Sequence, residues 1–405
     1  MESHADYYKP QLPDTQSLKT EISSLFLAKD AGPVKEHLAG LICKLLMRDE
    51  KAGLDYMEQF KSRYSVDGSE RVSVLITSYN TGNYIRACLK SILLQTYHNL
   101  EIILVDDGSS DNTLEQVKDI EDDRLKVFPF AQNRGRVAAL NEGLGKCTGA
   151  YIALMDSDDL ASPIRIEKLL AYCMQHSLSA VSSQLYEYSE GTPLTCSISS
   201  FSPDQGELKV RMLFYNAFPH AATLFRGETL KRTGYREGFP YAEDFEMLSR
   251  YISENVNVGL LSDPLYLYRR RGDSATGEAN FTKAYASQKE VIRNFIEANL
   301  FKPEEEELAL HLRMERNIRN PETDIDTLVA IRRWIHKLLR SNLAKHAFDQ
   351  ESLRKILIKN YWSVYYYANT KHHGLNLALR LMPFQGLRSN IITLKEAVKA
   401  MAEKK

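Results

Sequence analysis

The chain has 405 residues, of which 43% are hydrophobic and 26% charged, as in a soluble globular protein too long for one small core. The net charge of −1 argues against a nucleic-acid partner. Because no apolar run approaches the ~20 residues of a membrane helix and the start is polar, we expect a cytoplasmic protein. Five scattered cysteines without metal-binding spacing fit a reducing compartment.

Residues 1–70 are predicted to be helical and to contain no strand of note. Their apolar residues recur at the spacing of one helix face, most clearly in Leu38, Leu41, Ile42, Leu45 and Leu46. Residues 66–70 are interpreted as a linker. Packing of these helices against the following domain and a role in dimerisation are both open interpretations.

From Arg71 the pattern changes to strands that alternate with helices. Residues 72–77 and 100–105 predict two buried strands, and helical spacing between Tyr84 and Leu93 connects them in a right-handed βαβ unit. The elements expected next are a helix from Thr113, a short strand near Val127, a helix from Arg136 to Leu144 and a strand at 151–155. Nearly continuous apolar strands between helices predict an α/β fold with a mostly parallel sheet covered on both faces.

Three of the predicted strands end in polar residues. These ends are Thr77-Ser78-Tyr79-Asn80, Asp106-Asp107-Gly108-Ser109 and Asp156-Ser157-Asp158-Asp159. If the strands are parallel, the three ends meet at one edge of the sheet, where ligands bind in such folds. Three carboxylates around one serine repel each other, and Mg²⁺ or Mn²⁺ would relieve that repulsion. A surface loop with an Asp helix cap would explain the last cluster alone, but three convergent clusters favour a site.

Residues 281–405 return to helical spacing and carry a strong basic bias. From Ile331 to Lys405 there are 15 Lys or Arg residues and 4 Asp or Glu residues, which suggests an anionic partner. Trp334, Ile335 and Leu338 share an apolar face opposite basic residues, as in a helix lying on an anionic membrane surface. A helix packed on the preceding domain with its basic face in water, or a dimer contact, would explain the same pattern.

In combination, these motifs resemble a family 2 glycosyltransferase with the GT-A fold. The resemblance rests on residues 74–80, the Val105–Asp111 segment, Asn133-Arg134-Gly135 and the Asp156–Asp159 cluster, in that order. It covers about residues 71–275. It implies a Rossmann-like nucleotide-sugar-binding domain at 71–280, flanked by helical regions at 1–70 and 281–405.

The resemblance also implies roles for the residues at the strand ends. Thr77 and Tyr79 would lie at the nucleotide base and ribose, and Asp107 would accept a hydrogen bond from the base, which favours uracil. Asp156 and Asp158 match the DxD element that places metal and ribose. Asp158 would be the direct ligand of Mn²⁺ or Mg²⁺.

Later residues match the family's catalytic and acceptor-side positions. Asp244 would be the catalytic base, with Glu243 beside it, at a strand-to-helix boundary where Asp is also a good helix N-cap. His220 matches a histidine near the acceptor site, although a hydrogen-bonded core histidine is the plain alternative. Arg271 stands where relatives often carry a metal- or diphosphate-binding histidine, so it would either bind the diphosphate or belong to a solvated basic loop.

The activity implied is that of an inverting glycosyltransferase acting on a nucleotide-sugar, favoured to be a UDP-sugar. The acceptor would be a hydroxyl of a glycan or lipid-linked glycan in polysaccharide biosynthesis, at the inner face of the cell membrane. A degenerate, non-catalytic scaffold in a polysaccharide assembly complex is the alternative, and intact Asp107, Asp158 and Asp244 argue against it. The absence of GxGxxG after the first strand disfavours a dinucleotide-binding oxidoreductase. Arg333-Trp334 is only half of the QxxRW motif of processive synthases, because Ala330 occupies the Gln position.

Overall fold

The computed structural model describes residues 7–8, 12–27, 32–189, 195–199, 205–254, 256–270, 281–315 and 324–371. The chain divides into two compact units, Met1–Phe295 and Ile296–Lys405, and the division falls within one helix. The domain boundaries expected near residues 70 and 280 stay a prediction.

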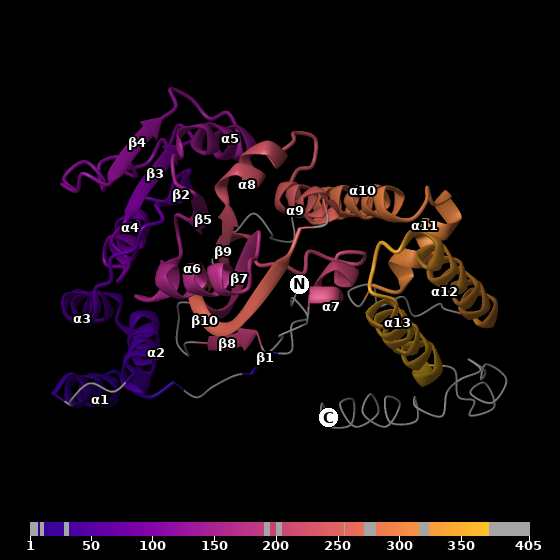
Figure 1. The fold of residues 1–405 in the computed structure, drawn as a ribbon, viewed down its shortest axis with the longest axis horizontal. Helices are drawn as coiled ribbons and strands as arrows, with labels where there is room; N and C mark the ends of the chain where they lie inside the picture. Colours follow the sequence, from indigo (N-terminus) through magenta and orange to yellow (C-terminus); the bar gives the residue numbers. More distant parts are fainter. Residues whose placement is uncertain are drawn as a thin grey trace. The chain divides into compact units, whose positions relative to one another are not determined.

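A sheet of ten strands organises the first unit (Figure 1), and four neighbouring strands form a purely parallel half-sheet. This half has the order β5-β2-β3-β4, formed by β2 (Val72–Ser78), β3 (Leu100–Asp106), β4 (Leu125–Pro129) and β5 (Tyr151–Asp156). All its neighbouring pairs are parallel. β2, β3 and β5 are apolar and almost wholly buried because helices cover both faces, as the sequence predicts, whereas the edge strand β4 is partly exposed.

The two faces of this half-sheet are covered by different helices. Val74 and Ile76 of β2 belong to the cluster that includes Ile85 and Cys88 of α4 (Ile85–Leu93). On the other face, α5 (Arg136–Lys146) packs on β2 and β3, and Gly143 leaves no room for a side chain against Leu75. Alternate residues of one strand therefore serve two cores.

The other half of the sheet is mixed. Its strands are β1 (Tyr7–Tyr8), β6 (Leu160–Ala161), β7 (Ala180–Ser189), β8 (Thr195–Ser199), β9 (Thr223–Arg226) and β10 (Val258–Arg270). β9 runs antiparallel between β5 and β7, whereas β10 is parallel to β7 and antiparallel to β6. The helices along this half are α6 (Arg165–Gln175), α7 (Gln205–Arg211), the 3₁₀ turn η1 (His220–Ala222), α8 (Gly227–Thr233) and α9 (Glu243–Ser253).

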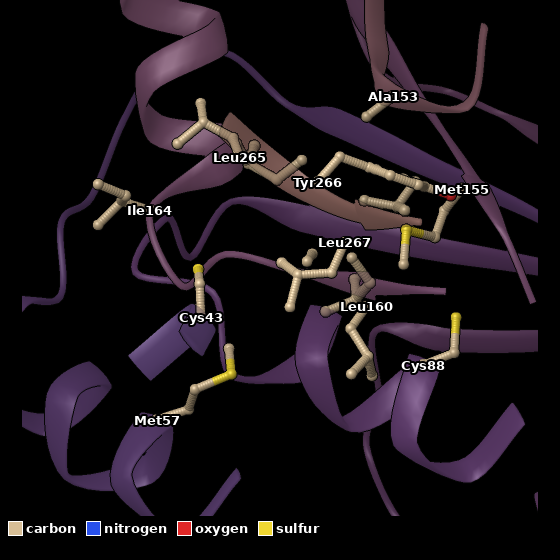
Figure 2. Packing of buried hydrophobic residues seen from close by; sticks show 14 of the residues in the cluster. Cys43, Met57, Cys88, Ala153, Met155, Leu160, Ile164, Leu265, Tyr266 and Leu267 are labelled. Carbon is tan, nitrogen blue, oxygen red and sulfur yellow. The ribbon is translucent and has the colours of Figure 1, made fainter. Parts of the chain in front are cut away.

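The N-terminal helices are part of the same core. They are α1 (Thr15–Leu27), α2 (Gly32–Arg48) and α3 (Glu50–Tyr64). Figure 2 shows Cys43 and Met57, from α2 and α3, in one apolar cluster with Leu160 and Leu267 from the sheet, and all four are buried. Ion pairs from Lys35 to Glu167 and from Glu36 to Lys168 extend this contact to α6. Packing against the following domain, one of the two open interpretations, is therefore confirmed.

The second unit contains helices over its described residues. α10 (Phe281–Asn299) spans the division between the units, and α11 (Glu305–Arg313), α12 (Ile325–Lys345) and α13 (Gln350–Lys371) follow. Trp334 of α12 is buried, donates to His311 Nδ1 at 3.2 Å and meets the ring of Phe301 edge to face. The apolar face for which a membrane surface was one interpretation is thus packed inside the unit. None of the helices described is both long and apolar enough to cross a bilayer.

Two local predictions are wrong. The segment from Thr113 forms a run of turns instead of a helix, because Val117 and Ile120 donate to carbonyls three residues back and Asp111 holds both the amide and the hydroxyl of Thr113. The N-terminal region also contains a strand, the two-residue β1, which pairs with β8.

Candidate active site

The three polar strand ends lie side by side, as predicted. In the parallel register, Thr77 of β2 is level with Val105 of β3 and with Asp156 of β5. The carboxyl ends of these three strands therefore form one continuous edge, which carries the acidic motifs. In an open α/β sheet this edge is the expected ligand site.

The two aspartates that end β3 have different surroundings. Asp106 is buried and accepts from the hydroxyls of Ser78 and Ser109 at 2.8 and 2.6 Å, so it joins β2 to the following turn. Asp107 instead contacts the Asn133-Arg134-Gly135 motif, and its carboxylate accepts from the backbone amides of Arg134 and Gly135 at 2.7 and 2.9 Å. The sequence spacing between these motifs is thus explained by a direct contact.

Gly108 allows that contact. Its φ of 69° is in the left-handed region, and a side chain there would overlap the backbone of Gln132 and Asn133. A neighbouring turn is fixed in the same way by Asn80, which has a φ of 52° and accepts from the amide of Ser110 at 2.9 Å. Tyr79 between Thr77 and Asn80 is 49% exposed, so its ring is available to a ligand.

The Asp156–Asp159 cluster contains three carboxylates with three different surroundings. Asp156 pairs with Arg136 at 2.8 Å. Asp159 is buried and accepts from the hydroxyl of Tyr266 and from the amide of Arg269, both at 2.7 Å. Burial, together with the neighbouring Asp158 and Asp156 carboxylates, raises the pKa of Asp159 well above its usual range. Asp159 therefore serves the structure of the loop.

Asp158 is the carboxylate that fits a metal. Its side chain is partly buried, and its main-chain carbonyl is held by Arg269 at 2.9 Å. Within the described ranges, no three His, Cys, Asp or Glu side chains gather as a ready metal site. Mg²⁺ and Mn²⁺ bound with nucleotides use one or two carboxylates and complete their shell with phosphates and water. The residues present thus fit a cation that enters with a diphosphate.

Arg136, which the sequence analysis did not assign to the site, connects the two acidic motifs. Its guanidinium contacts Asp156 at 2.8 Å and Glu243 at 3.1 Å, and its side chain is 44% exposed. Both carboxylates raise its pKa, with Asp156 the larger cause. Its position immediately after Asn133-Arg134-Gly135 is the signal that would have found it.

Asp244 lies in the first turn of α9 rather than at its cap. The N-cap is Ala242, so the N-cap alternative is wrong, and the preceding segment is a loop rather than the expected strand. The Asp244 carboxylate accepts from the amide of Phe245 at 2.7 Å and from Asn216 at 3.0 Å. Burial, followed by the nearby Glu243 charge, raises its pKa to about 6. A carboxylate with this pKa is suited to act as a general base near neutral pH.

His220 is buried and hydrogen-bonded to the hydroxyl of Tyr235 at 2.6 Å. Burial and the charge of Arg136 lower its pKa to about 3, so the imidazole is neutral. This is the core arrangement given above as the plain alternative, and a role beside the acceptor stays a prediction. Arg271 lies outside the described residues.

Comparison with known proteins identifies the family. A family model described as Glycosyl transferase family 2 matches residues 73–229. An uncharacterized glycosyltransferase of Haemophilus influenzae is 32% identical over 236 residues, 54% of this chain and 71% of the relative. The O-antigen biosynthesis glycosyltransferase WbnJ of Escherichia coli is 29% identical over 219 residues, 52% of this chain and 84% of the relative.

A third relative carries a more specific name. The UDP-Glc:alpha-D-GlcNAc-diphosphoundecaprenol beta-1,3-glucosyltransferase WfgD of Escherichia coli is 26% identical over 226 residues, 56% of this chain and 87% of the relative. The parallel half-sheet, the antiparallel β9 beside it and the acidic strand ends are the arrangement expected of the GT-A fold, and the family model and the relatives make the chain a glycosyltransferase. The chain belongs to glycosyl transferase family 2.

Proposed function

We propose that this enzyme is an inverting glycosyltransferase that moves a sugar from a UDP-sugar to a hydroxyl of a glycan or lipid-linked glycan in polysaccharide biosynthesis. The Arg136 bridge is the observation that carries the proposal. One guanidinium contacts Asp156 of the donor motif and Glu243, which precedes the candidate base Asp244. The base therefore lies one side chain away from the donor site, as a direct displacement requires.

The donor would bind along the edge formed by the strand ends. Thr77 and the exposed ring of Tyr79 would contact the nucleoside, and Asp156 the ribose. Asp107 would accept a hydrogen bond from the nucleobase. A carboxylate has about four lone-pair sites, and the 133–135 segment donates only three hydrogen bonds to Asp107, a single one of them to Oδ1. The carboxylate that holds the 133–135 segment would then also contact the nucleobase.

The transfer requires one base and one displacement. Asp244 removes the proton from the acceptor hydroxyl, and that oxygen attacks the anomeric carbon as the bond from this carbon to the diphosphate oxygen breaks. Attack opposite the leaving group inverts the anomeric centre. A Mn²⁺ or Mg²⁺ ion, when bound, supplies positive charge that stabilises the departing diphosphate. Asp158 would hold that ion with Asp156, and Arg271 would contact the diphosphate.

The names of two relatives support the donor and acceptor classes. WfgD is named for a UDP-Glc donor, a diphosphoundecaprenol-linked acceptor and a beta linkage. WbnJ is named for O-antigen biosynthesis. A UDP-sugar donor and a lipid-linked glycan acceptor are therefore the first pair to test.

We also propose that the second unit associates with an anionic membrane surface through charge. The exposed residues of α12 include Arg333 and Arg340, and Lys337, which also pairs with Glu307; the three recur at the spacing of one helix face. Since Trp334 is buried, association would be electrostatic, without insertion of the helix. Flotation with phosphatidylglycerol vesicles tests this. The double variant Arg333→Glu/Arg340→Glu should lose salt-sensitive binding, whereas Lys90→Glu, an exposed charge reversal in the first unit, should keep it.

Nucleotide-sugar hydrolysis by the purified protein tests the activity. The panel contains UDP-, GDP- and dTDP-sugars with Mn²⁺ or EDTA, beside Asp158→Ala and Asp244→Ala. We expect turnover of a UDP-sugar that is lost with EDTA and in Asp158→Ala, and, since water is the acceptor in hydrolysis, initial release of the β-anomer from an α-linked donor. Retention of the anomeric configuration would refute the mechanism. Turnover that survives EDTA would shift the diphosphate contact to basic residues such as Arg271, and no turnover or nucleotide binding at all would favour a non-catalytic scaffold.

A further inference from the structure

A buried guanidinium lies beneath the loop that carries Asp158. Arg269, near the end of β10, exposes only 4% of its side chain. Its charged group lies over the rings of Tyr84 and Tyr188, at 5.0 and 5.2 Å from the ring centroids. A guanidinium so far from water is stable only when hydrogen-bonded and balanced by an anion. The groups that pair with Arg269 therefore affect the position of the segment to which Arg269 donates its hydrogen bonds.

On one side, Arg269 holds the backbone of the Asp156–Asp159 loop. Its Nε donates to the main-chain carbonyl of Asp158 at 2.9 Å, and its amide donates to the carboxylate of Asp159 at 2.7 Å. Tyr266, three residues earlier on β10, adds its hydroxyl, which accepts from the amide of Asp156 at 3.1 Å. Strand β10 thus fixes the direction in which the Asp158 side chain projects.

On the other side, Arg269 is held by the N-terminal helices. Its Nη2 donates to Glu50 Oε2 at 2.7 Å, and Glu50 is the first residue of α3. A carboxylate in the first turn is favoured by the helix dipole. The start of this helix is itself fixed, because the N-cap Asp49 accepts from Ala52 at 3.1 Å and from Lys19 at 2.9 Å.

We propose that Glu50 is a positioning residue of the donor site, so that the N-terminal helices form a structural part of that site. The inference rests on the proposed function, in which Asp158 meets the metal and diphosphate of the donor. Glu50 balances Arg269, and Arg269 sets the backbone of Asp158. Without the Glu50 charge, the buried guanidinium loses an ion-pair partner and holds the Asp158 carbonyl less firmly, so the Asp158 side chain is less well placed for the ligand.

Outer partners of metal-binding residues typically contribute 10–100-fold to affinity or activity. We therefore expect Glu50→Gln, in the full chain, to weaken binding of UDP with Mn²⁺ by about that factor. The KM for the donor should rise more than kcat falls, because Asp244 is not part of this connection. Glu50→Asp, which keeps the charge, should recover part of the affinity.

Lys35→Met is the matched control. It breaks another ion pair between the N-terminal helices and the core, from Lys35 to Glu167 at 2.8 Å, which touches neither Arg269 nor the loop. Calorimetric titration of UDP with Mn²⁺, beside thermal melting, separates the two effects. Lys35→Met should lower the melting temperature and leave UDP affinity within about twofold, well below the change expected for an outer partner.

The outcomes distinguish this inference from the proposed function. If the wild type binds UDP with Mn²⁺ and Glu50→Gln binds it equally well, Glu50 has no positioning role. If Glu50→Gln loses affinity only as much as Lys35→Met does, the effect is one of general stability and the inference is again wrong. If the wild type binds no nucleoside diphosphate, the proposed function fails first. Should Glu50→Gln melt below the assay temperature, the titration is repeated for all variants at a temperature where it is folded, and equal UDP affinity of Glu50→Gln and Lys35→Met there overturns the proposal.

Discussion

The amide of Asn216 is one of the groups that favour the ionised form of Asp244, beside the Phe245 amide and the charge of Arg136. Asn216 donates to Asp244 Oδ2 at 3.0 Å, and this bond favours the ionised carboxylate against the burial that raises its pKa to about 6. Asn216→Ala removes the donor and leaves the carboxylate with the Phe245 amide and the more distant Arg136 charge. The pKa of Asp244 should therefore rise.

The size of the change follows from the strength of one hydrogen bond to a charged group. Such a bond contributes about 1.5–3 kcal/mol, and the lower figure applies because Asp244 is partly exposed. About 1.4 kcal/mol corresponds to one pKa unit, so the pKa should move from about 6 to about 7. At pH 6 the ionised fraction then falls from about a half to about a tenth, a roughly fivefold loss that disappears at about pH 9.

The assay is kcat/KM for sugar transfer between pH 5 and 9, which reports the pKa of the free enzyme. Asn99→Ala is the control, because Asn99 also donates its side-chain amide, at 3.0 Å to the carbonyl of Gly68, away from the strand-end edge. The acid limb should move upward in Asn216→Ala alone. An acid limb that stays in place or moves downward would show that Asp244 is not the base that limits the rate.

Three further outcomes are expected. Asp244→Asn should lower kcat/KM by roughly 10²–10⁴ and leave the affinity for UDP unchanged in calorimetry, whereas a parallel loss of affinity would assign Asp244 to donor binding. Glu101→Gln should cost about 3 kcal/mol at neutral pH in thermal or urea unfolding, because the Ser73 hydroxyl and the amide and hydroxyl of Thr148 outweigh burial and lower the pKa of buried Glu101 to about 2. The Glu101 carboxyl binds a proton less tightly in the folded state than in the unfolded chain. The loss of unfolding free energy relative to wild type should therefore be complete above pH 4.5 and vanish as the pH falls to about 2. A loss that does not depend on pH would refute this. Finally, Mn²⁺ should bind tightly only when UDP is present, and a tight site in nucleotide-free protein would contradict a cation held by Asp158 and Asp156 together with the diphosphate.

The strand ends were predictable because their signal is local. An apolar run followed at once by acidic residues indicates both a buried strand and its carboxyl end, and the parallel register then places Thr77 beside Asp156. The α/β class and the sheet covered on both faces follow from the same alternation. The direction of β9 was not predictable, because a strand of four residues carries no mark of antiparallel pairing.

The contacts that hold the motifs were not predictable, because they join segments far apart in the chain. Asn216 reaches Asp244 from 28 residues away, and Glu50 reaches Arg269 from 219 residues away. A lone Asn or Glu in an ordinary sequence has no distinguishing spacing. Of these contact residues, Arg136 alone could have been predicted from the sequence, because it directly follows the Asn133-Arg134-Gly135 motif, which was already assigned to the site.

Repulsion among the three carboxylates at the end of β5 indicates a metal from the sequence, but the structure shows that the protein itself relieves much of this repulsion. Arg136 pairs with Asp156, and burial raises the pKa of Asp159, which disfavours its charge, so the repulsion among the three carboxylates is reduced by the protein itself. Under the proposed function, a cation at Asp158 would then serve the incoming diphosphate rather than hold the loop together. The fold can thus keep the acidic edge intact before the donor arrives, and the donor brings the charge that makes a metal favourable there.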